Sequence, residues 1–421
     1  MILSFLLAAL LAQQPAGPNN TSTSKEDQDL EQSLSEAGGS PVEYARALER
    51  HLKKYPNSER RGEYQRVLAQ AAIDLRDKRR LLLYGVPVLE AGSRNPQLLD
   101  HVTRTLLDRE DATSATEALK YSRLLVQVMD DQRKAQLDPS QAVPARGRRL
   151  EETEYALARA RTFEARALSI LGKFDESDAA ALAGWAVSPT EENARERARN
   201  LERAGKFKEA LAAFSEALAL AGDRSTSADA AKDGARLASL SKQASGQEGG
   251  FGSVMLAAYD RAAAAQAAQK LRLKSADPNY AAAKPLEFTL TATTGPPLDL
   301  STLKGKVVVI DFWATWCGPC RAQHPLYEQV KAKFKSTPDV VFLAVSTDED
   351  RGVVAPFLKA QKWPALAYFE DGMASTLRIS SIPTAMILDR QGNIVSRMNG
   401  YIADRFVNMM SDRIQEALEE K

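Results

Sequence analysis

The chain has 421 residues, of which 44% are hydrophobic, and this length predicts two or three domains with sizeable cores. Its 56 basic and 55 acidic residues leave a formal net charge of +1 without a strongly basic block, which argues against nucleic acid as the main partner. Cysteine occurs only twice, in a single Cys-x-x-Cys, so the sequence predicts no framework of structural disulfides.

The first 20 residues are interpreted as a signal peptide or an N-terminal apolar segment. Met1–Ala12 is almost wholly apolar, but it is shorter than the ~20 residues that a membrane-spanning helix needs. The run fits the apolar region of a secretory signal, although no Lys or Arg precedes it. We therefore expect an exported protein, periplasmic or membrane-associated outside the cytoplasm. The polar residues 21–39 are predicted to form a flexible linker.

Residues 40–275 are predicted to be helical. Ser40 and Pro41 supply an N-cap and a proline at the first helical position, and Glu43 completes a capping box. Further on, Leu-Gly-Lys-Phe-Asp-Glu at 171–176 is similar to Ala-Gly-Lys-Phe-Lys-Glu at 204–209, with the two glycines 33 residues apart. The second copy should have a buried stripe of Phe207, Leu211, Phe214 and Leu218. The segment Gly222–Gly252, rich in Ser, Gly, Asp and Ala, is expected to interrupt the array.

The period and the glycine turns of this region resemble tetratricopeptide repeats, which are about 34 residues long. The resemblance implies an array of helix pairs with a concave surface that could hold a protein partner. A helical spacer without a ligand is equally compatible with the sequence, since no exposed aromatic or arginine cluster marks a groove.

Residues 276–285 are interpreted as a linker, and residues 286–421 as an α/β domain. In this domain a strand-like run, Val307–Ile310, leads into Trp316-Cys317-Gly318-Pro319-Cys320, and an amphipathic stretch follows. Strand, Cys-x-x-Cys and helix in this order predict a thiol redox centre. Cys317 should lie at the helix N-terminus, where free N–H groups and the helix dipole favour a thiolate, with its sulfur toward solvent. Cys320, one turn further, should resolve the mixed disulfide that Cys317 forms.

Other chemistries fit these residues less well. A zinc site needs four ligands, and only His324, which we expect at the surface, is nearby in sequence. A cysteine hydrolase would need a base from elsewhere in the fold. Asp311 interrupts the apolar strand before the motif, and burial should raise the pKa of its carboxyl group. Beneath Cys320, such an acid could take and return the resolving thiol's proton.

The stretch from Val309 to Cys320 resembles the active site of the thioredoxin superfamily. Ser381–Thr384 resembles the loop that carries its cis-proline, and the leading hairpin and the insertion at 348–378 are similar to the TlpA/ResA branch. This resemblance implies a thioredoxin-like α/β/α domain. It further implies a thiol–disulfide oxidoreductase that needs neither cofactor nor metal beyond the Cys317–Cys320 pair, and whose partners are protein thiols or disulfides and a membrane thiol donor.

The same resemblance assigns the substrate site. Pro383 should be cis and face the redox pair, so that the backbone of Ile382 can pair with an extended substrate. Trp316 should offer an apolar contact to the partner, and Gly318-Pro319 is the dipeptide of reducing family members. The lysine that accompanies the buried acid in thioredoxins aligns with Ala344, which should change the pH dependence.

Two other function classes stay open at this point. One is an interaction protein in which the helical array sets the function and the redox domain is secondary. The other is a thiol peroxidase, which is disfavoured because Ala314-Thr315-Trp316 lacks the peroxidase-type Pro-x-x-x-Thr-x-x-Cys pattern.

Overall fold

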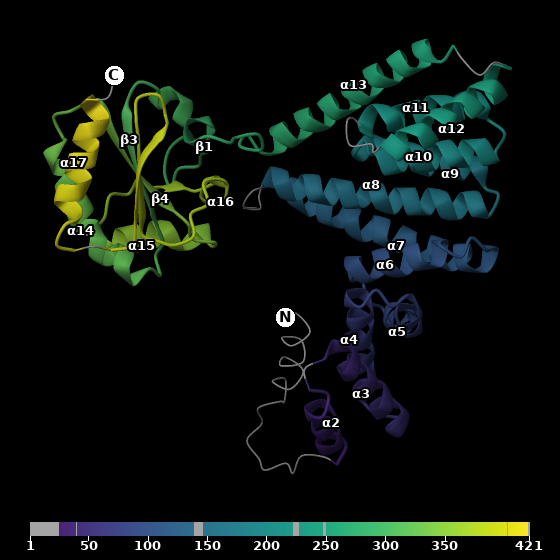
Figure 1. Ribbon diagram of the computed structural model, residues 1–421. Helices are drawn as coiled ribbons and strands as arrows, with labels where there is room; N and C mark the ends of the chain where they lie inside the picture. Colours follow the sequence, from purple (N-terminus) through teal and green to yellow (C-terminus); the bar gives the residue numbers. More distant parts are fainter. Residues whose placement is uncertain are drawn as a thin grey trace. The chain divides into compact units, whose positions relative to one another are not determined.

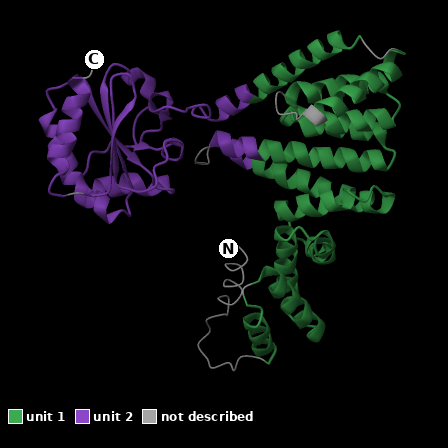
Figure 2. Cartoon of the chain, in the orientation of Figure 1, with its two compact units in different colours: residues 1–133, 153–269 green, residues 134–152, 270–421 purple. Residues whose placement is uncertain are grey.

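The computed structural model describes residues 25–38, 40–138, 146–221, 227–246, 250–401 and 403–419 (Figure 1). Contacts divide the chain into two compact units, residues 1–133 with 153–269 and residues 134–152 with 270–421 (Figure 2). The predicted export segment lies outside the described residues. Among the helices that the structure describes, none is both long and apolar enough to cross a lipid bilayer.

The regular secondary structure in the described residues of the first unit is helical, as the sequence predicts. Small and large apolar residues alternate with charged ones at three- and four-residue spacing, so each helix has one face to bury. Three of the helices, α7, α8 and α13, continue into the second unit. The helices are α2 (Lys25–Ser35), α3 (Pro41–Lys54), α4 (Arg61–Asp74), α5 (Lys78–Glu90), α6 (Pro96–Leu107), α7 (Ala112–Leu137), α8 (Arg146–Ile170), α9 (Phe174–Val187), α10 (Glu191–Arg203), α11 (Phe207–Ala221), α12 (Ser227–Ser245) and α13 (Gly252–Ala276).

Helix α2 corrects the prediction of a flexible linker over residues 21–39. Leu30 and Leu34, one helical turn apart, are buried in a cluster with α3 and α4. Asp29 also accepts hydrogen bonds from Lys54 and Tyr55 at the end of α3. Two leucines and a few ionic contacts are thus enough to order a segment that is polar in composition. Helix α3 begins at Pro41 as predicted, but the hydroxyl of Ser40 makes no cap hydrogen bond, so the capping box is not formed.

The two glycine turns of the predicted repeat have the same geometry. Gly172 and Gly205 have φ angles of +74° and +72°, which glycine adopts without steric cost. After each glycine, a lysine N–H donates a 2.9 Å hydrogen bond back into the preceding helix, from Lys173 to the carbonyl of Leu168 and from Lys206 to the carbonyl of Leu201. The glycine turns are therefore confirmed, and the assignment to tetratricopeptide repeats stays a prediction.

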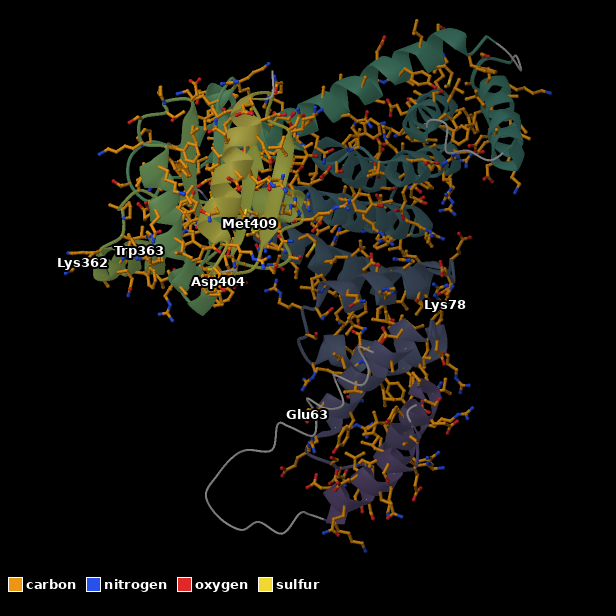
Figure 3. All side chains as sticks on the ribbon, turned by 60° about the vertical axis from the view of Figure 1, so that its left-hand side comes forward. Glu63, Lys78, Lys362, Trp363, Asp404 and Met409 are labelled. Atoms are coloured by element: carbon orange, nitrogen blue, oxygen red, sulfur yellow. A yellow bond between two sulfur atoms is a disulfide. The ribbon has the colours of Figure 1, made fainter. Side chains whose placement is uncertain are left out.

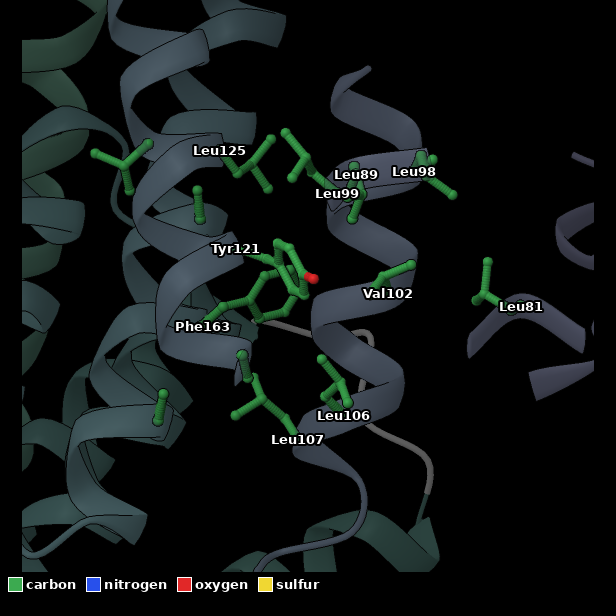
Figure 4. Packing of buried hydrophobic residues seen from close by; sticks show 14 of the residues in the cluster. Leu81, Leu89, Leu98, Leu99, Val102, Leu106, Leu107, Tyr121, Leu125 and Phe163 are labelled. Atoms are coloured by element: carbon green, nitrogen blue, oxygen red, sulfur yellow. The ribbon is translucent and has the colours of Figure 1, made fainter. Parts of the chain in front are cut away.

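The stripe predicted for the second copy is only partly correct. Phe214 and Leu211 are buried, whereas Phe207 and Leu218 are half-buried. Helix α12 contradicts the interruption predicted for Gly222–Gly252, because its Leu237 and Leu240 lie in one cluster with α10 and α11. In the largest cluster of this unit, Tyr121 of α7 and Phe163 of α8 pack beside Val102 and Leu106 of α6 (Figure 4).

The second unit contains a five-stranded sheet in the order β5-β4-β3-β6-β7 and a small antiparallel hairpin, β1-β2. Strand β4 runs parallel to both of its neighbours, β3 and β5. Strand β6 is antiparallel to β3, and β7 is antiparallel to β6. The hairpin and the thioredoxin-like arrangement confirm the fold predicted for residues 286–421. The strands are β1 (Thr289–Leu290), β2 (Leu298–Asp299), β3 (Val307–Trp313), β4 (Val340–Ser346), β5 (Tyr368–Phe369), β6 (Thr384–Leu388) and β7 (Ile394–Asn399).

Both faces of this sheet are covered. Helices α14 (Gly318–Lys333) and α17 (Phe406–Glu419) pack on the face that Val307 and Val309 of β3 share with Ile387 of β6. The hairpin and α16 (Met373–Thr376) cover the other face, and α15 (Val354–Gln361) packs near the carboxyl end of β3. Because side chains alternate along a strand, Asp311 of β3 points to the α14 face.

Candidate active site

Cys317 and Cys320 form a disulfide at the start of α14, directly after the central strand β3. Cys317 is the N-cap residue, and Cys320 lies in the first turn, with 5.3 Å between their Cα atoms. The backbone N–H of Cys320 donates a 3.1 Å hydrogen bond to the sulfur of Cys317. Gly318 and Pro319 fill the first two helical positions, where a missing N–H costs nothing. The predicted strand, motif and helix are therefore in place.

The helix start distinguishes the two sulfurs electrostatically. Only the sulfur of Cys317 accepts an N–H of the first turn, where the helix dipole stabilises negative charge. Exposure does not distinguish them: in this disulfide form each cysteine is 4% exposed, so the sulfur of Cys317 does not face solvent as expected. Trp316, which is 71% exposed, is the apolar side chain of the motif that projects into solvent.

Asp311 lies in the centre of the sheet, between Ala344 of β4 and Ala385 of β6. The residue is half-buried, but protein atoms surround its carboxyl group densely, and this desolvation raises the pKa of Asp311 to about 7. A 3.3 Å hydrogen bond from the Nε2 of Gln323 opposes the shift, because it stabilises the carboxylate. The strand position thus produces the raised pKa that the sequence predicts, and Ala344 does stand beside Asp311.

The sequence reasoning did not single out Gln323. This residue lies on α14 one turn after Cys320, it is 1% exposed, and its Oε1 has no hydrogen-bond partner among the described residues. An amide can donate to a carboxylate and, once turned over, accept from a carboxylic acid. Gln323 is therefore able to hydrogen-bond Asp311 in both protonation states. Its spacing of three residues from Cys320 was the available signal.

The Ile382–Pro383 peptide bond is cis, as predicted. Pro383 is buried, and Ile382 packs against the cluster that contains both cysteines and Trp313. The turn is tied into the sheet by the carbonyl of Pro383, which accepts a 2.8 Å hydrogen bond from the N–H of Gly400. The structure therefore brings Ile382 of the loop before β6 into contact with the redox cluster from a segment more than 60 residues away in sequence.

Asp348 is a second residue that the sequence reasoning missed. Its carboxylate, in a residue that is 9% exposed, accepts the N–H of Thr315 on both oxygens and the hydroxyl of Thr315 at 2.7 Å. The Ser346 hydroxyl donates to the same carboxylate at 2.9 Å. These bonds connect the loop after β4 to the residue two before Cys317, and so they position the redox loop. A carboxylate just past the end of the neighbouring parallel strand was the available signal, since such ends meet at one edge.

His324 is half-buried, not at the surface as expected. Its ring lies edge-on against Trp363, which is labelled in Figure 3, with 3.6 Å between the ring centroids. Burial lowers the pKa of His324. Trp313, expected to be a packing residue, is buried between Phe357 and Trp363. Within the described ranges, no three His, Cys, Asp or Glu side chains gather in a group that could hold a metal ion.

Comparisons with known proteins converge on this unit. A profile of the thioredoxin-like family matches residues 305–394, which include Asp311, both cysteines and Pro383. The thiol-disulfide oxidoreductase ResA of Bacillus cereus is 30% identical over 115 residues, which are 27% of this chain and 66% of that protein. A thioredoxin of Coprinus comatus is 34% identical over 85 residues, which are 20% of this chain and 78% of the thioredoxin.

A solved structure, a secreted disulfide oxidoreductase of Mycobacterium tuberculosis, is 27% identical to the matched part of this chain. The match covers 31% of this chain and 96% of that chain, with a TM-score of 0.28. The chain thus spans 66% of the length of the ResA protein, and most of its own length lies outside the region it shares with that relative.

Proposed function

Since this chain belongs to the thioredoxin-like family, we propose that it is a thiol–disulfide oxidoreductase that reduces protein disulfides through Cys317 and Cys320. The observation that carries the proposal is the disulfide at the start of α14, with Asp311 on the strand beneath that helix. The redox group is the chain's own cysteine pair, so the reaction itself requires no cofactor.

In the reductive direction, the thiolate of Cys317 attacks one sulfur of a partner disulfide. A bond forms between Cys317 and that sulfur, and the other partner sulfur leaves with the electron pair. Asp311 as a carboxylate then takes the proton of the Cys320 thiol. The Cys320 thiolate attacks the sulfur of Cys317, which closes the disulfide and releases the second partner thiolate. Two electrons pass from the protein dithiol to the partner.

The partner would bind at the surface around Trp316, Gly318 and Pro319 on one side and Ile382 and Pro383 on the other. The exposed indole of Trp316 supports an apolar contact there. The backbone beside a cis-proline presents polar groups that can pair with an extended segment of a substrate. Ile382 contacts the cluster that contains Cys317, the residue next to Trp316 in sequence.

Direction and compartment are part of the proposal. Gly318-Pro319 between the cysteines favours a reductase over an oxidase, as the family resemblance implies. The apolar Met1–Ala12 supports export to the periplasm or the outer side of a membrane. In an oxidising compartment the disulfide would be re-reduced by a membrane thiol donor, because no soluble reductant holds thiols reduced there.

The helical array is proposed to consist of tetratricopeptide-like repeats that hold a protein partner. Its similar turns at Gly172 and Gly205 support a repeated unit. The second candidate function, an interaction protein with a secondary redox domain, is favoured by the share of the chain that the array occupies. In that case a Cys317→Ser/Cys320→Ser variant should still complement a deletion strain, whereas a reductase requires both cysteines.

The proposal is tested by mixing the reduced full-length chain with a protein disulfide, such as that of insulin, and a dithiol donor. We expect catalysed disulfide reduction that depends on Cys317. Disulfide reduction no faster than in the absence of the protein would contradict the proposal. Peroxide consumption at a rate matching disulfide reduction would also contradict it, in favour of a thiol peroxidase.

A further inference from the structure

A cavity of about 320 Å³ lies behind the redox pair, between α14, the edge of β4 and the segment before β5. Most of its lining is apolar. The ionisable groups that β3 and α14 contribute to it include the two residues of the reaction: Asp311, Cys320, His324, Tyr327, Glu328 and Lys331. The two groups between which the resolving proton moves therefore share one space.

This space is separate from the surface proposed to bind the partner. Within the described part of the chain, Trp316, Cys317, Ile382 and Pro383 do not line the cavity, and Cys320 is the only cysteine that does. The cavity reaches the surface where half-exposed Glu328 and Lys331 form a 2.8 Å ion pair and where Leu366 is 49% exposed. A partner seated over Cys317 would leave this exit uncovered.

The cavity is suited to water. Its volume is many times the ~10–15 Å³ that one water needs, and its lining offers hydrogen-bonding groups. The indole Nε1 of Trp313, a residue that lines the cavity and is 3% exposed, has no hydrogen-bond partner among the described residues. In addition, Val345 and Ser346 are the residues of β4 that pair with β5, so β4 from Val341 to Ala344 lies at a sheet edge that β5 leaves uncovered, beside the cavity.

We propose that this cavity is a water-filled proton route, through which Asp311 exchanges its proton with bulk water while a partner covers the front of the redox site. The inference rests on the proposed thiol–disulfide exchange, because that reaction loads the proton onto Asp311. The cavity would thus carry out proton exchange, a step in which the residues at the proposed partner surface, Trp316, Ile382 and Pro383, take no part.

The Cys320 thiol loses its proton to the Asp311 carboxylate, the new Cys317–Cys320 bond forms, and the bond from Cys317 to the partner breaks. The electron pair leaves on the partner thiolate, which takes a proton from bulk water. Asp311, now a carboxylic acid, gives its proton to a cavity water, and the proton leaves the cavity at the exit. One proton is released there for the one taken up in front.

The other ionisable groups along the route suit such a transfer. Burial lowers the pKa of His324, so its ring is neutral near pH 7 and can both accept and donate a proton. Burial also keeps the Tyr327 phenol protonated by raising its pKa, and its hydroxyl is occupied by the carbonyls of Val309 and Leu343. At the remaining positions of the lining, Glu328 and Lys331 pair with each other, and burial raises the pKa of the Tyr368 phenol.

The route is tested by narrowing it at Ala344, which stands beside Asp311 and lines the cavity. In the full-length chain, Ala344→Leu fills the inner end, whereas Ala344→Ser keeps the space and serves as the matched control. The carboxyl infrared band of Asp311, identified by its loss in Asp311→Asn, is followed after a pH jump. The two phases of a single turnover with a peptide disulfide are recorded beside it.

With Ala344→Leu we expect the band to respond about tenfold more slowly, and the resolution phase to slow with it, while the first attack by Cys317 is unchanged. A band response and a resolution phase equal to those of Ala344→Ser would overturn the proton route. If the wild-type chain performs no exchange at all, the proposed function fails instead, and the band response still tests the route. Should Ala344→Leu melt far below wild type, Leu366→Trp at the exposed exit replaces it, with the same expected direction and the same contradicting outcome.

Discussion

The buried carboxylates of the helical array and Asp311 of the thioredoxin-like unit differ in their hydrogen-bond partners. In the helical array, Glu164, Glu196 and Glu216 are almost fully buried, and each contacts an arginine at 3.0 Å or less. In the thioredoxin-like unit, Asp311 has the amide of Gln323 and no cationic partner among the described residues. The arginine-bound carboxylates of the array make charge-assisted hydrogen bonds that hold helices together. Desolvation without a cation raises the pKa of Asp311 to about 7, where an acid can exchange protons.

The largest expected effect is at the two sulfurs of the proposed reaction. Cys317→Ser should lower the rate of disulfide exchange by a factor on the order of 10³ or more, because the attacking thiolate is gone. Cys320→Ser should still attack, but it should accumulate as a mixed disulfide with the partner. Non-reducing gels of the two variants measure this. Trapping by Cys317→Ser in place of Cys320→Ser would reverse the roles.

Removing the carboxyl group of Asp311, which has no cationic partner among the described residues, should stabilise the second unit at high pH. The pKa of Asp311 is about 7 in the folded protein and near 3.8 in the unfolded chain. The stabilisation of the folded state by this carboxyl group is therefore fully present below pH 3.8 and is lost as the pH rises through 7. Asp311→Asn is therefore expected to raise the free energy of unfolding at pH 8 by about 2–4 kcal/mol. Urea unfolding followed by fluorescence measures it, since Trp313, Trp316 and Trp363 lie in this unit. Equal stability of the two proteins at pH 4 is the internal control.

Removing one arginine of the first unit should weaken the support of a buried carboxylate, Glu216, whose second arginine, Arg197, is 4.0 Å away. Arg261 of α13 donates a 2.6 Å hydrogen bond to Glu216 of α11. Arg261→Met should lower the free energy of unfolding by about 1.5–3 kcal/mol, because a buried carboxylate loses a charged donor. Arg261→Lys keeps the charge and should cost less. If Arg261→Met is neutral, or if adding Glu216→Gln to it restores no stability, the ion pairs do not support the array.

The converse change gives Asp311 a cation. Ala344→Lys would place an ammonium group beside the carboxylate, which should lower the pKa of Asp311 by about one unit. The pH at which the resolution step reaches half its maximal rate should fall by the same amount. Single-turnover rates between pH 5 and 9, with Ala344→Met as an uncharged control, measure the shift. An unchanged profile would mean that Asp311 does not set the pH dependence.

Local signals in the sequence were sufficient for the redox pair and for the raised pKa of Asp311, because each depends on residues that are close together in the chain. The cis bond at Pro383 was predicted from the resemblance of Ser381–Thr384 to the thioredoxin loop. Asp348 and Gln323 were missed, since their partners become visible only when β4 lies beside β3 and α14 packs over the sheet. The cavity could not be predicted for the same reason: it is the space left where a short β5 leaves β4 uncovered.

Composition misled the reading of the array in two places. Helices α2 and α12 form in segments rich in polar or small residues, because two leucines in each find an apolar cluster of neighbouring helices to pack against. Tertiary burial thus outweighed local propensity there. Phe207 is half-buried although its spacing placed it on the buried stripe, since periodicity identifies a face but not how far a neighbour extends over it.

The central claim is that the two sulfurs have different roles although they are equally buried in the disulfide. The most direct measurement is the rate of alkylation against pH for the single remaining cysteine in reduced Cys320→Ser and Cys317→Ser. We predict that Cys317 reacts with a pKa clearly below the 8.5 of a free thiol, because it caps α14, and that Cys320 reacts far more slowly at neutral pH. Faster alkylation of Cys320 than of Cys317 at pH 7 would contradict the account.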